Sequence, residues 1–93
     1  MNKKELKTKA SQTIDDVSAK LDELKKKREE VSKDAHEKYD SAIADLEKRK
    51  SDLEDKFSEM KSASDETFEK ASNAFSEASE SFKEGFEKLT NWS

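Results

Sequence analysis

The residues whose side chains could do chemistry are few in this sequence. Cysteine is absent, and histidine occurs once, at His36. Asp40 follows His36 by one helical turn, a spacing that would allow a weak surface contact with a metal ion. The neighbouring acids Asp34 and Glu37 indicate instead an ordinary solvent-facing histidine. A lone histidine without cysteine excludes paired-histidine metal motifs, thiolate catalysis and disulfides, so we expect no metal site and no cofactor.

Other catalytic arrangements lack their residues as well. The chain has one glycine and no proline, so no glycine-rich loop can cradle a phosphate. Carboxylates are numerous, but on exposed helices they should titrate near their ordinary pKa values, unlike a general acid held in a pocket. The basic run at 25–28 is followed at once by two glutamates, and the whole chain is acidic. We therefore expect no enzymatic activity and no nucleic-acid partner.

Composition limits the fold that could hold such residues. Of the 93 residues, 45 % are charged and 30 % are hydrophobic, and nine of the hydrophobic ones are alanine. A chain of this size predicts a single domain, 1–93, without a deep core that could enclose a reaction. Neither an apolar run long enough to cross a bilayer nor a secretory leader is recognisable, so we expect a cytoplasmic protein.

The charges are spaced as on exposed helices. Acids often precede bases by four residues, as Glu5 precedes Lys9, and each such pair stabilises a helix by about 0.2–0.5 kcal/mol. There are nine bases and seven acids over 1–31, seven and nine over 32–61, and three and seven over 62–93. Because parallel pairing of one long helix would set like charges side by side, this gradient favours antiparallel packing.

Apolar residues recur at helical spacing along most of the chain. The stripe passes through a four-residue stutter between Ala35 and Tyr39, which relaxes a supercoil without breaking the helix. We interpret it as a self-association seam formed by Ile14, Val17, Leu21, Leu24, Val31, Tyr39, Leu46, Leu53, Met60, Phe68, Phe75, Phe82 and Leu89. We call these thirteen residues the predicted seam.

Small residues follow the large ones in the C-terminal part of the seam. Ala71, Ala78 and Gly85 each lie three positions after a phenylalanine. Small side chains let a neighbouring backbone approach closely, so we interpret Gly85 as a close-packing position, although glycine costs about 1 kcal/mol of helix propensity relative to alanine. A kink at Gly85 is the alternative.

The two parts of the seam meet at a predicted turn. Ser62 and Ser64 both have the spacing of helix caps, and Asp65 and Glu66 would lie in the first turn of a new helix. We therefore predict an all-α antiparallel hairpin with a long helix over 3–61, a turn at 62–64 and a shorter helix over 65–91.

Two other architectures remain open. A break beside the stutter, at Ser32–Asp34, would give a three-helix bundle, whereas no break at all would give a single continuous helix. The acid–base pairs Glu29–Lys33 and Asp34–Lys38 run through the first of these points, which favours an unbroken helix there.

The predicted hairpin implies a partner chain. At 1.5 Å per residue its helices would be about 88 Å and about 40 Å long. The shorter helix would leave the seam from Ile14 to Val31 facing water. We therefore expect a coiled-coil homo-oligomer, most simply an antiparallel dimer.

The C-terminal two thirds of the chain resemble a known family. The residues concerned are Tyr39-x-x-x-Ile43-x-x-Leu46-x-x-Arg49, Leu53, Lys61-x-Ala63-Ser64-x-x-x-Phe68-Glu69, Phe75, Phe82 and Phe86. They resemble a family of small bacterial coiled-coil proteins, mostly uncharacterised, that includes a cyanobacterial stress-response protein. Family members often have tryptophan where this chain has Phe68 and Phe82. The resemblance covers roughly 35–90 and implies a self-associating helical hairpin linked to stress, without catalytic residues.

Three functional hypotheses follow from these patterns. The leading one is a structural or scaffold protein that self-associates and could bind a further protein. The second is an amphipathic membrane-surface binder acting through 65–92, although three bases against seven acids fit a lipid surface poorly. The third is a stress protectant that becomes helical on drying, against which the regular phenylalanine spacing argues.

Overall fold

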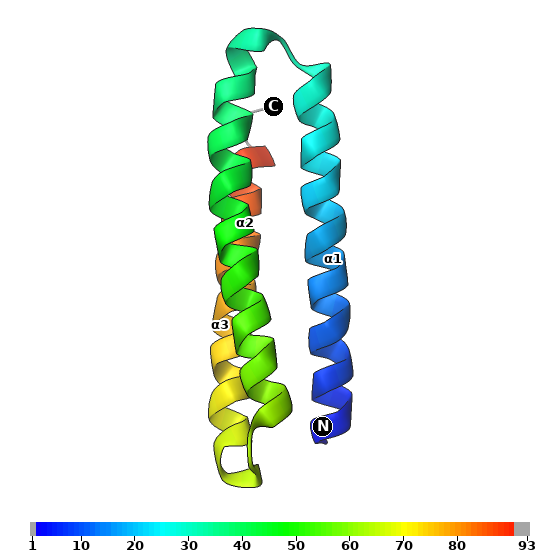
Figure 1. Ribbon diagram of the computed structural model, residues 1–93, viewed down its shortest axis with the longest axis vertical. Helices are drawn as coiled ribbons and strands as arrows, with labels where there is room; N and C mark the ends of the chain where they lie inside the picture. The colour runs from blue at the N-terminus through cyan, green and yellow to red at the C-terminus, as the bar shows by residue number, and fades with distance from the viewer. Residues whose placement is uncertain (1, 91–93) are drawn as a thin grey trace.

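Three helices run up, down and up along one long axis (Figure 1). The computed structural model describes residues 2–90, in which α1 covers Lys3–Glu30, α2 covers Lys33–Ser62 and α3 covers Asp65–Thr90. The bundle measures 50 × 19 × 16 Å. The all-α class predicted from the sequence is confirmed, and the three helices fit the three-helix bundle that the sequence left as an alternative. The predicted helix end at 91 lies outside the described residues.

The prediction of one helix over 3–61 is wrong. Val31 and Ser32 have extended backbone, with φ/ψ of −92°/165° and −64°/158°, and the chain reverses direction there (Figure 1). The reversal covers the apolar stripe of α1 within the same chain, and burying each valine or leucine is worth about 1.5–3 kcal/mol. The surface pairs that favoured an unbroken helix are worth only about 0.2–0.5 kcal/mol each, so burial decides the outcome.

The second turn lies close to its predicted place. α2 ends at Ser62, whose hydroxyl donates to the Ser58 carbonyl at 3.0 Å, so Ser62 closes α2 and does not cap the next helix as predicted. Ser64 precedes α3, and its carbonyl accepts from the Phe68 amide at 2.9 Å. Asp65 lies in the first turn, where the helix dipole favours an acid.

The core is entirely apolar. The buried residues are Ala10, Val17, Leu21, Leu24, Ile43, Leu46, Leu53, Met60, Phe68, Phe75, Ala78, Phe82 and Leu89. Ten of them belong to the predicted seam, whereas Ile14, Val31 and Tyr39 are only partly covered. The predicted seam is therefore the interior of a single chain. Its first part does not face water as the hairpin required, so that argument for a second chain loses its basis.

Gly85 of α3 faces α2 at close range. A Cβ atom built on Gly85 would lie 3.0 Å from Cδ2 of Leu46 and 3.3 Å from Cζ of Arg49. Its φ is not positive, and α3 continues unbroken through it. Close packing, not a kink, accounts for this glycine. Of the other two predicted close-packing positions, Ala78 is buried and Ala71 is half-buried.

Replacing Gly85 by valine should destabilise the bundle by about 1–3 kcal/mol, because the added carbons meet the buried Leu46 side chain. Urea unfolding followed by circular dichroism measures the change. The matched control is Glu84→Val, on the exposed side of the same helix, which should shift the free energy of unfolding by no more than about 0.5 kcal/mol. Equal effects of the two variants would contradict the close-packing interpretation.

Candidate interaction surface on α1 and α3

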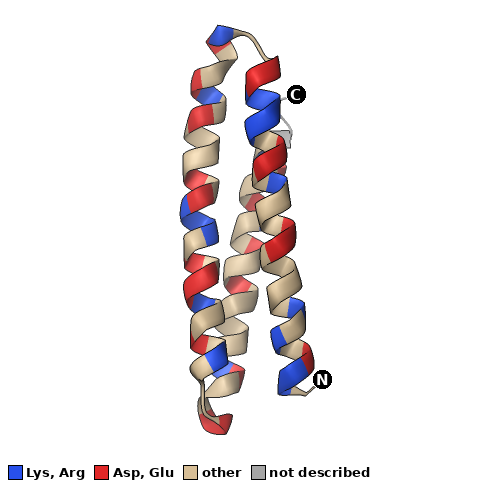
Figure 2. Cartoon of the chain, turned by 45° about the vertical axis from the view of Figure 1, so that its right-hand side comes forward, with Lys and Arg blue, Asp and Glu red and all other residues tan. Residues whose placement is uncertain are grey.

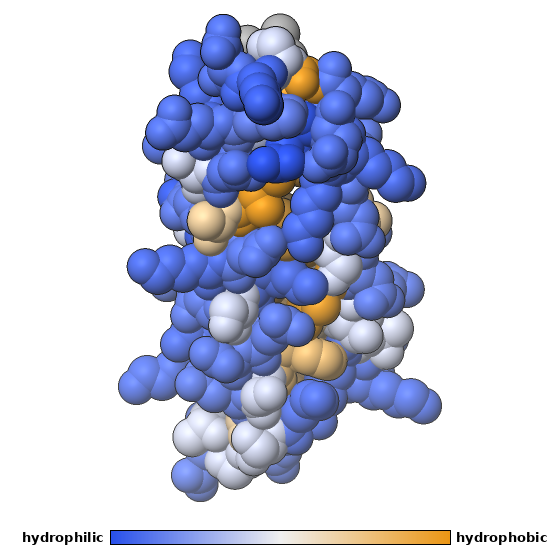
Figure 3. Space-filling view, turned by 45° about the horizontal axis from the view of Figure 1, so that its top comes forward, coloured by the Kyte–Doolittle hydropathy of each residue, from blue (hydrophilic) through white to orange (hydrophobic). Residues whose placement is uncertain are grey.

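Acidic and basic side chains occupy different positions on the bundle. All 23 Asp and Glu residues are exposed, whereas six bases are half-buried: Lys3, Lys7, Arg28, Arg49, Lys50 and Lys56. Figure 2 shows basic and acidic residues distributed along all the helices. Figure 3 shows hydrophobic residues in a band between rows of hydrophilic ones. Long basic side chains can lay their aliphatic stems along apolar surface and keep the charge in water. These six bases therefore border the core, whereas every acid is exposed.

Lysines of α1 lie over phenylalanine rings of α3. The Nζ atoms of Lys3 and Lys7 are 5.3 Å and 5.9 Å from the ring centroid of Phe68, and Nζ of Lys20 is 5.3 Å from that of Phe86. At exposed sites each such contact is worth about 0.5–1 kcal/mol. We call these five residues the α1–α3 seam. It is the weaker side of α1, which packs mainly against α2 and touches α3 at far fewer points.

Between the two ends of the α1–α3 seam lies a groove of about 210 Å³. Small side chains such as Ala10, Thr13 and Ser76 line its walls, and the buried Met60 and Phe75 also border it. Ligand pockets for small molecules are usually about 300–1,000 Å³. The groove offers hydroxyls but no histidine or cysteine. Lys9 and Glu80 also line this groove between α1 and α3.

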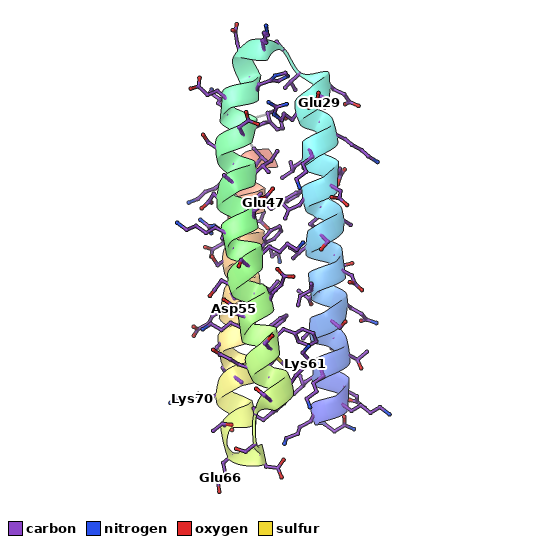
Figure 4. All side chains as sticks on the ribbon, in the orientation of Figure 1. Glu29, Glu47, Asp55, Lys61, Glu66 and Lys70 are labelled. Carbon is purple, nitrogen blue, oxygen red and sulfur yellow. The ribbon has the colours of Figure 1, made fainter. Side chains whose placement is uncertain are left out.

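Ion pairs hold α1 at its two ends. Lys3 pairs with Asp65 at the start of α3. At the other end Arg28 donates from Nε and Nη2 to the carboxylate of Asp40, with Nη2 3.1 Å from Oδ2. Nη1 of Arg28 lies 2.8 Å from Oε1 of Glu29. Figure 4 shows Glu29 beside this turn. The Arg28 contacts close the turn at Val31–Ser32, and the carboxylates of all these pairs are exposed to solvent.

The same pairs shift pKa values. The hydrogen bond and charge of Arg28 hold the pKa of Asp40 below its usual range, and those of Lys3 do the same for Asp65. The hydrogen bond that Arg28 donates to Asp40 in turn raises the pKa of Arg28. A carboxyl whose pKa is lowered by folding stabilises the fold at pH values above its ordinary pKa. That stabilisation is lost as the pH falls through the lowered pKa.

Acid should therefore loosen α1 before it unfolds α2 and α3. As the pH falls below about 4, the ordinary aspartate range, Asp40 and Asp65 lose their attraction for Arg28 and Lys3. Amide hydrogen exchange along a pH series should show α1 losing protection first. In the double variant Asp40→Asn, Asp65→Asn, α1 should already be loosened at neutral pH and respond less to acid. A variant that keeps the full acid response would show that other carboxyls cause it.

Hydrogen bonds from Arg49 join α2 to α3 in addition to apolar packing. Nη1 of Arg49 donates to the carbonyl of Ser81 at 2.6 Å and to its hydroxyl at 3.0 Å, while Nε of Arg49 donates to Asp45 at 3.0 Å. This half-buried contact lies beside Gly85, whose added Cβ would meet Arg49. α2 packs extensively against both other helices, whereas α1 and α3 touch each other at few points.

The remaining chemical candidates have structural roles. His36 lies 3.1 Å from the Val31 carbonyl, beside the first turn. Within residues 2–90 no group of His, Cys, Asp and Glu side chains could hold a metal ion, and no helix is long and apolar enough to cross a membrane. Trp92, part of the second functional hypothesis, lies outside the described residues. Sequence reasoning missed Arg28 as a turn contact, although a base within an apolar stripe was a usable signal.

Comparison with known proteins adds no relative. No protein-family model matches the chain, and neither the curated proteins nor the solved structures contain a match to it. Its function must therefore be argued from its own geometry.

Proposed function

We propose that the protein is a non-enzymatic interaction protein that associates with copies of itself by exchanging α1. The observation that carries the proposal is the one-sided attachment of α1, which packs against α2 and touches α3 at few points. Solvent-exposed ion pairs and lysine–ring contacts hold its ends and its α3 side. Its remaining contacts are mainly apolar packing against α2, and a second copy offers the same surface.

Exchange requires a new backbone conformation only at the two residues that link α1 to α2. If Val31 and Ser32 became helical, α1 and α2 would form one helix over 3–62 with α3 folded back on its second half. The stripe of α1 would then pack on α2 of another copy, and the apolar contacts of the closed chain would be kept between chains. The acid–base pairs that cross 31–32 and the charge gradient along the chain both suit this antiparallel dimer.

A cross-chain disulfide tests the exchange directly. Nζ of Lys25 in α1 lies 3.3 Å from Oε1 of Glu47 in α2, and the chain has no cysteine of its own. Lys25→Cys and Glu47→Cys chains are mixed, loosened in mild urea, returned to native buffer at high concentration and oxidised. Exchange predicts a covalent heterodimer that joins positions 25 and 47.

The matched control is Lys26→Cys, which lies on the exposed side of the same helix. Mixed with Glu47→Cys, it should give far less heterodimer, because exchange reproduces the contact of Lys25 and not of Lys26. Equal yields would mean random collision of open chains. No heterodimer from either mixture would contradict the proposal.

The resemblance of 35–90 to stress-response coiled-coil proteins supplies a setting for this exchange. Heat or acid that weakens the exposed contacts of α1 would favour association, whereas the closed chain would predominate in unstressed conditions.

A further inference from the structure

We propose that α1 also binds anionic phospholipid bilayers, with its apolar stripe in the membrane interface and its bordering bases on the headgroup phosphates. The partner is a lipid surface and not a second copy. The proposal shares with the proposed function only the release of α1 from the bundle.

The positions of the charges carry this inference. Lys3 and Lys7 border the apolar face of α1 closely enough to be half-buried, and Lys20 reaches over the Phe86 ring from the same helix. Every carboxylate of α1 is exposed. With the apolar face in the bilayer interface, the bordering lysines would reach the phosphates while the acids point to water. The charge arrangement therefore complements an anionic surface.

Release of α1 would strand no polar group. The buried residues of the described chain are all hydrophobic, and no buried side-chain nitrogen or oxygen lacks a partner. Buried stripe residues of α1 such as Val17, Leu21 and Leu24 would exchange one apolar environment for another. The polar contacts that must break are exposed ones, which water replaces at small cost.

This inference places lipid binding on a different helix from the one that the sequence suggested. Aromatic residues pointed to 65–92, but α3 has three bases and seven acids. α1 has nine bases and seven acids, and its rim is basic. α3 also shares the Arg49 contacts and the close approach at Gly85 with α2. α1 is therefore the helix with both the charge and the freedom for a bilayer.

Vesicle co-sedimentation with a locked variant tests the proposal. In the double variant Thr13→Cys, Ser76→Cys the two thiols line the groove between α1 and α3, so a short bis-maleimide linker can tie the two helices together. The vesicles are phosphatidylcholine with or without phosphatidylglycerol. We expect the unlinked variant to bind the anionic vesicles well above the neutral ones, and the linked variant to lose most of this binding. Equal binding by the linked chain, or no preference for anionic vesicles, would overturn the proposal.

Charge placement is tested separately from charge number. Replacing Lys3, Lys7 and Lys20 by glutamine should weaken binding to anionic vesicles by roughly a hundredfold, since all three reach the headgroups. The control replaces Lys4, Lys26 and Lys48, which are exposed, and should lose much less. Equal losses would mean non-specific attraction and would overturn the proposal. Because the vesicle assay uses dilute protein and the disulfide assay uses none of these lipids, lipid binding and self-exchange can fail independently.

Discussion

Replacing Leu53 by alanine should lower the free energy of unfolding by about 2–5 kcal/mol. Leu53 lies in α2, the helix that packs extensively against both others, and its side chain is 0 % exposed. Removing its branched end would leave a cavity that three packed helices cannot close without moving. Native domains are stable by only about 5–15 kcal/mol, and small ones lie near the lower end. The variant should therefore be partly unfolded near body temperature.

Chemical unfolding followed by circular dichroism measures this loss. The control is Asp52→Ala, an exposed neighbour on the same helix, which should stay within about 0.5 kcal/mol of the unmodified chain. If Leu53→Ala were as stable as its control, the core would not lie between these three helices.

Replacing Lys33 by proline should separate the closed chain from the exchanged dimer. Lys33 is the first residue of α2, where proline is well tolerated, and Ser32 before it has the extended backbone that proline requires. In the continuous helix of the dimer the same proline would lie in the interior and cost about 3 kcal/mol in each chain. We expect a monomer that is at least as stable as the unmodified chain and forms no exchanged dimer.

The opposite change should favour exchange. Alanine at both Val31 and Ser32 raises the helix propensity of the link, so the fraction of dimer after refolding at high concentration should rise. Light scattering after gel filtration measures both variants, and Lys33→Ala controls for the lost charge. A Lys33→Pro chain that dimerises like Lys33→Ala would show that association does not need a helical link.

The two turns of the bundle have different causes: local helix-start signals set the second, and packing of the whole chain sets the first. The second turn could be predicted because Ser64, Asp65 and Glu66 carry helix-start signals at the place where the stripe changes register. At the first turn the sequence offered a break at Ser32–Asp34 only as an alternative, because charged pairs continue across it. What reverses the chain there is burial of the α1 stripe against α2 and α3, a property of the whole chain.

The candidate surface could also be predicted only in part from the sequence. The apolar stripe was visible as a period, and ten of the thirteen residues of the predicted seam are buried. The lysines over Phe68 and Phe86 were not visible, because a helical period does not say which neighbouring helix a bordering base will reach. Assigning those contacts required knowing that α1 and α3 run parallel, side by side (Figures 1 and 2).

The distance between positions 3 and 65 tests the central claim, that one chain closes α1 onto α2 and α3. Both positions are changed to cysteine and given a donor and an acceptor dye, and the labelled chains are diluted with unlabelled ones. The structure pairs these side chains directly, so energy transfer should be nearly complete. A continuous helix over 3–62 would hold the dyes about 90 Å apart. Near-zero transfer in dilute native buffer would contradict the closed bundle.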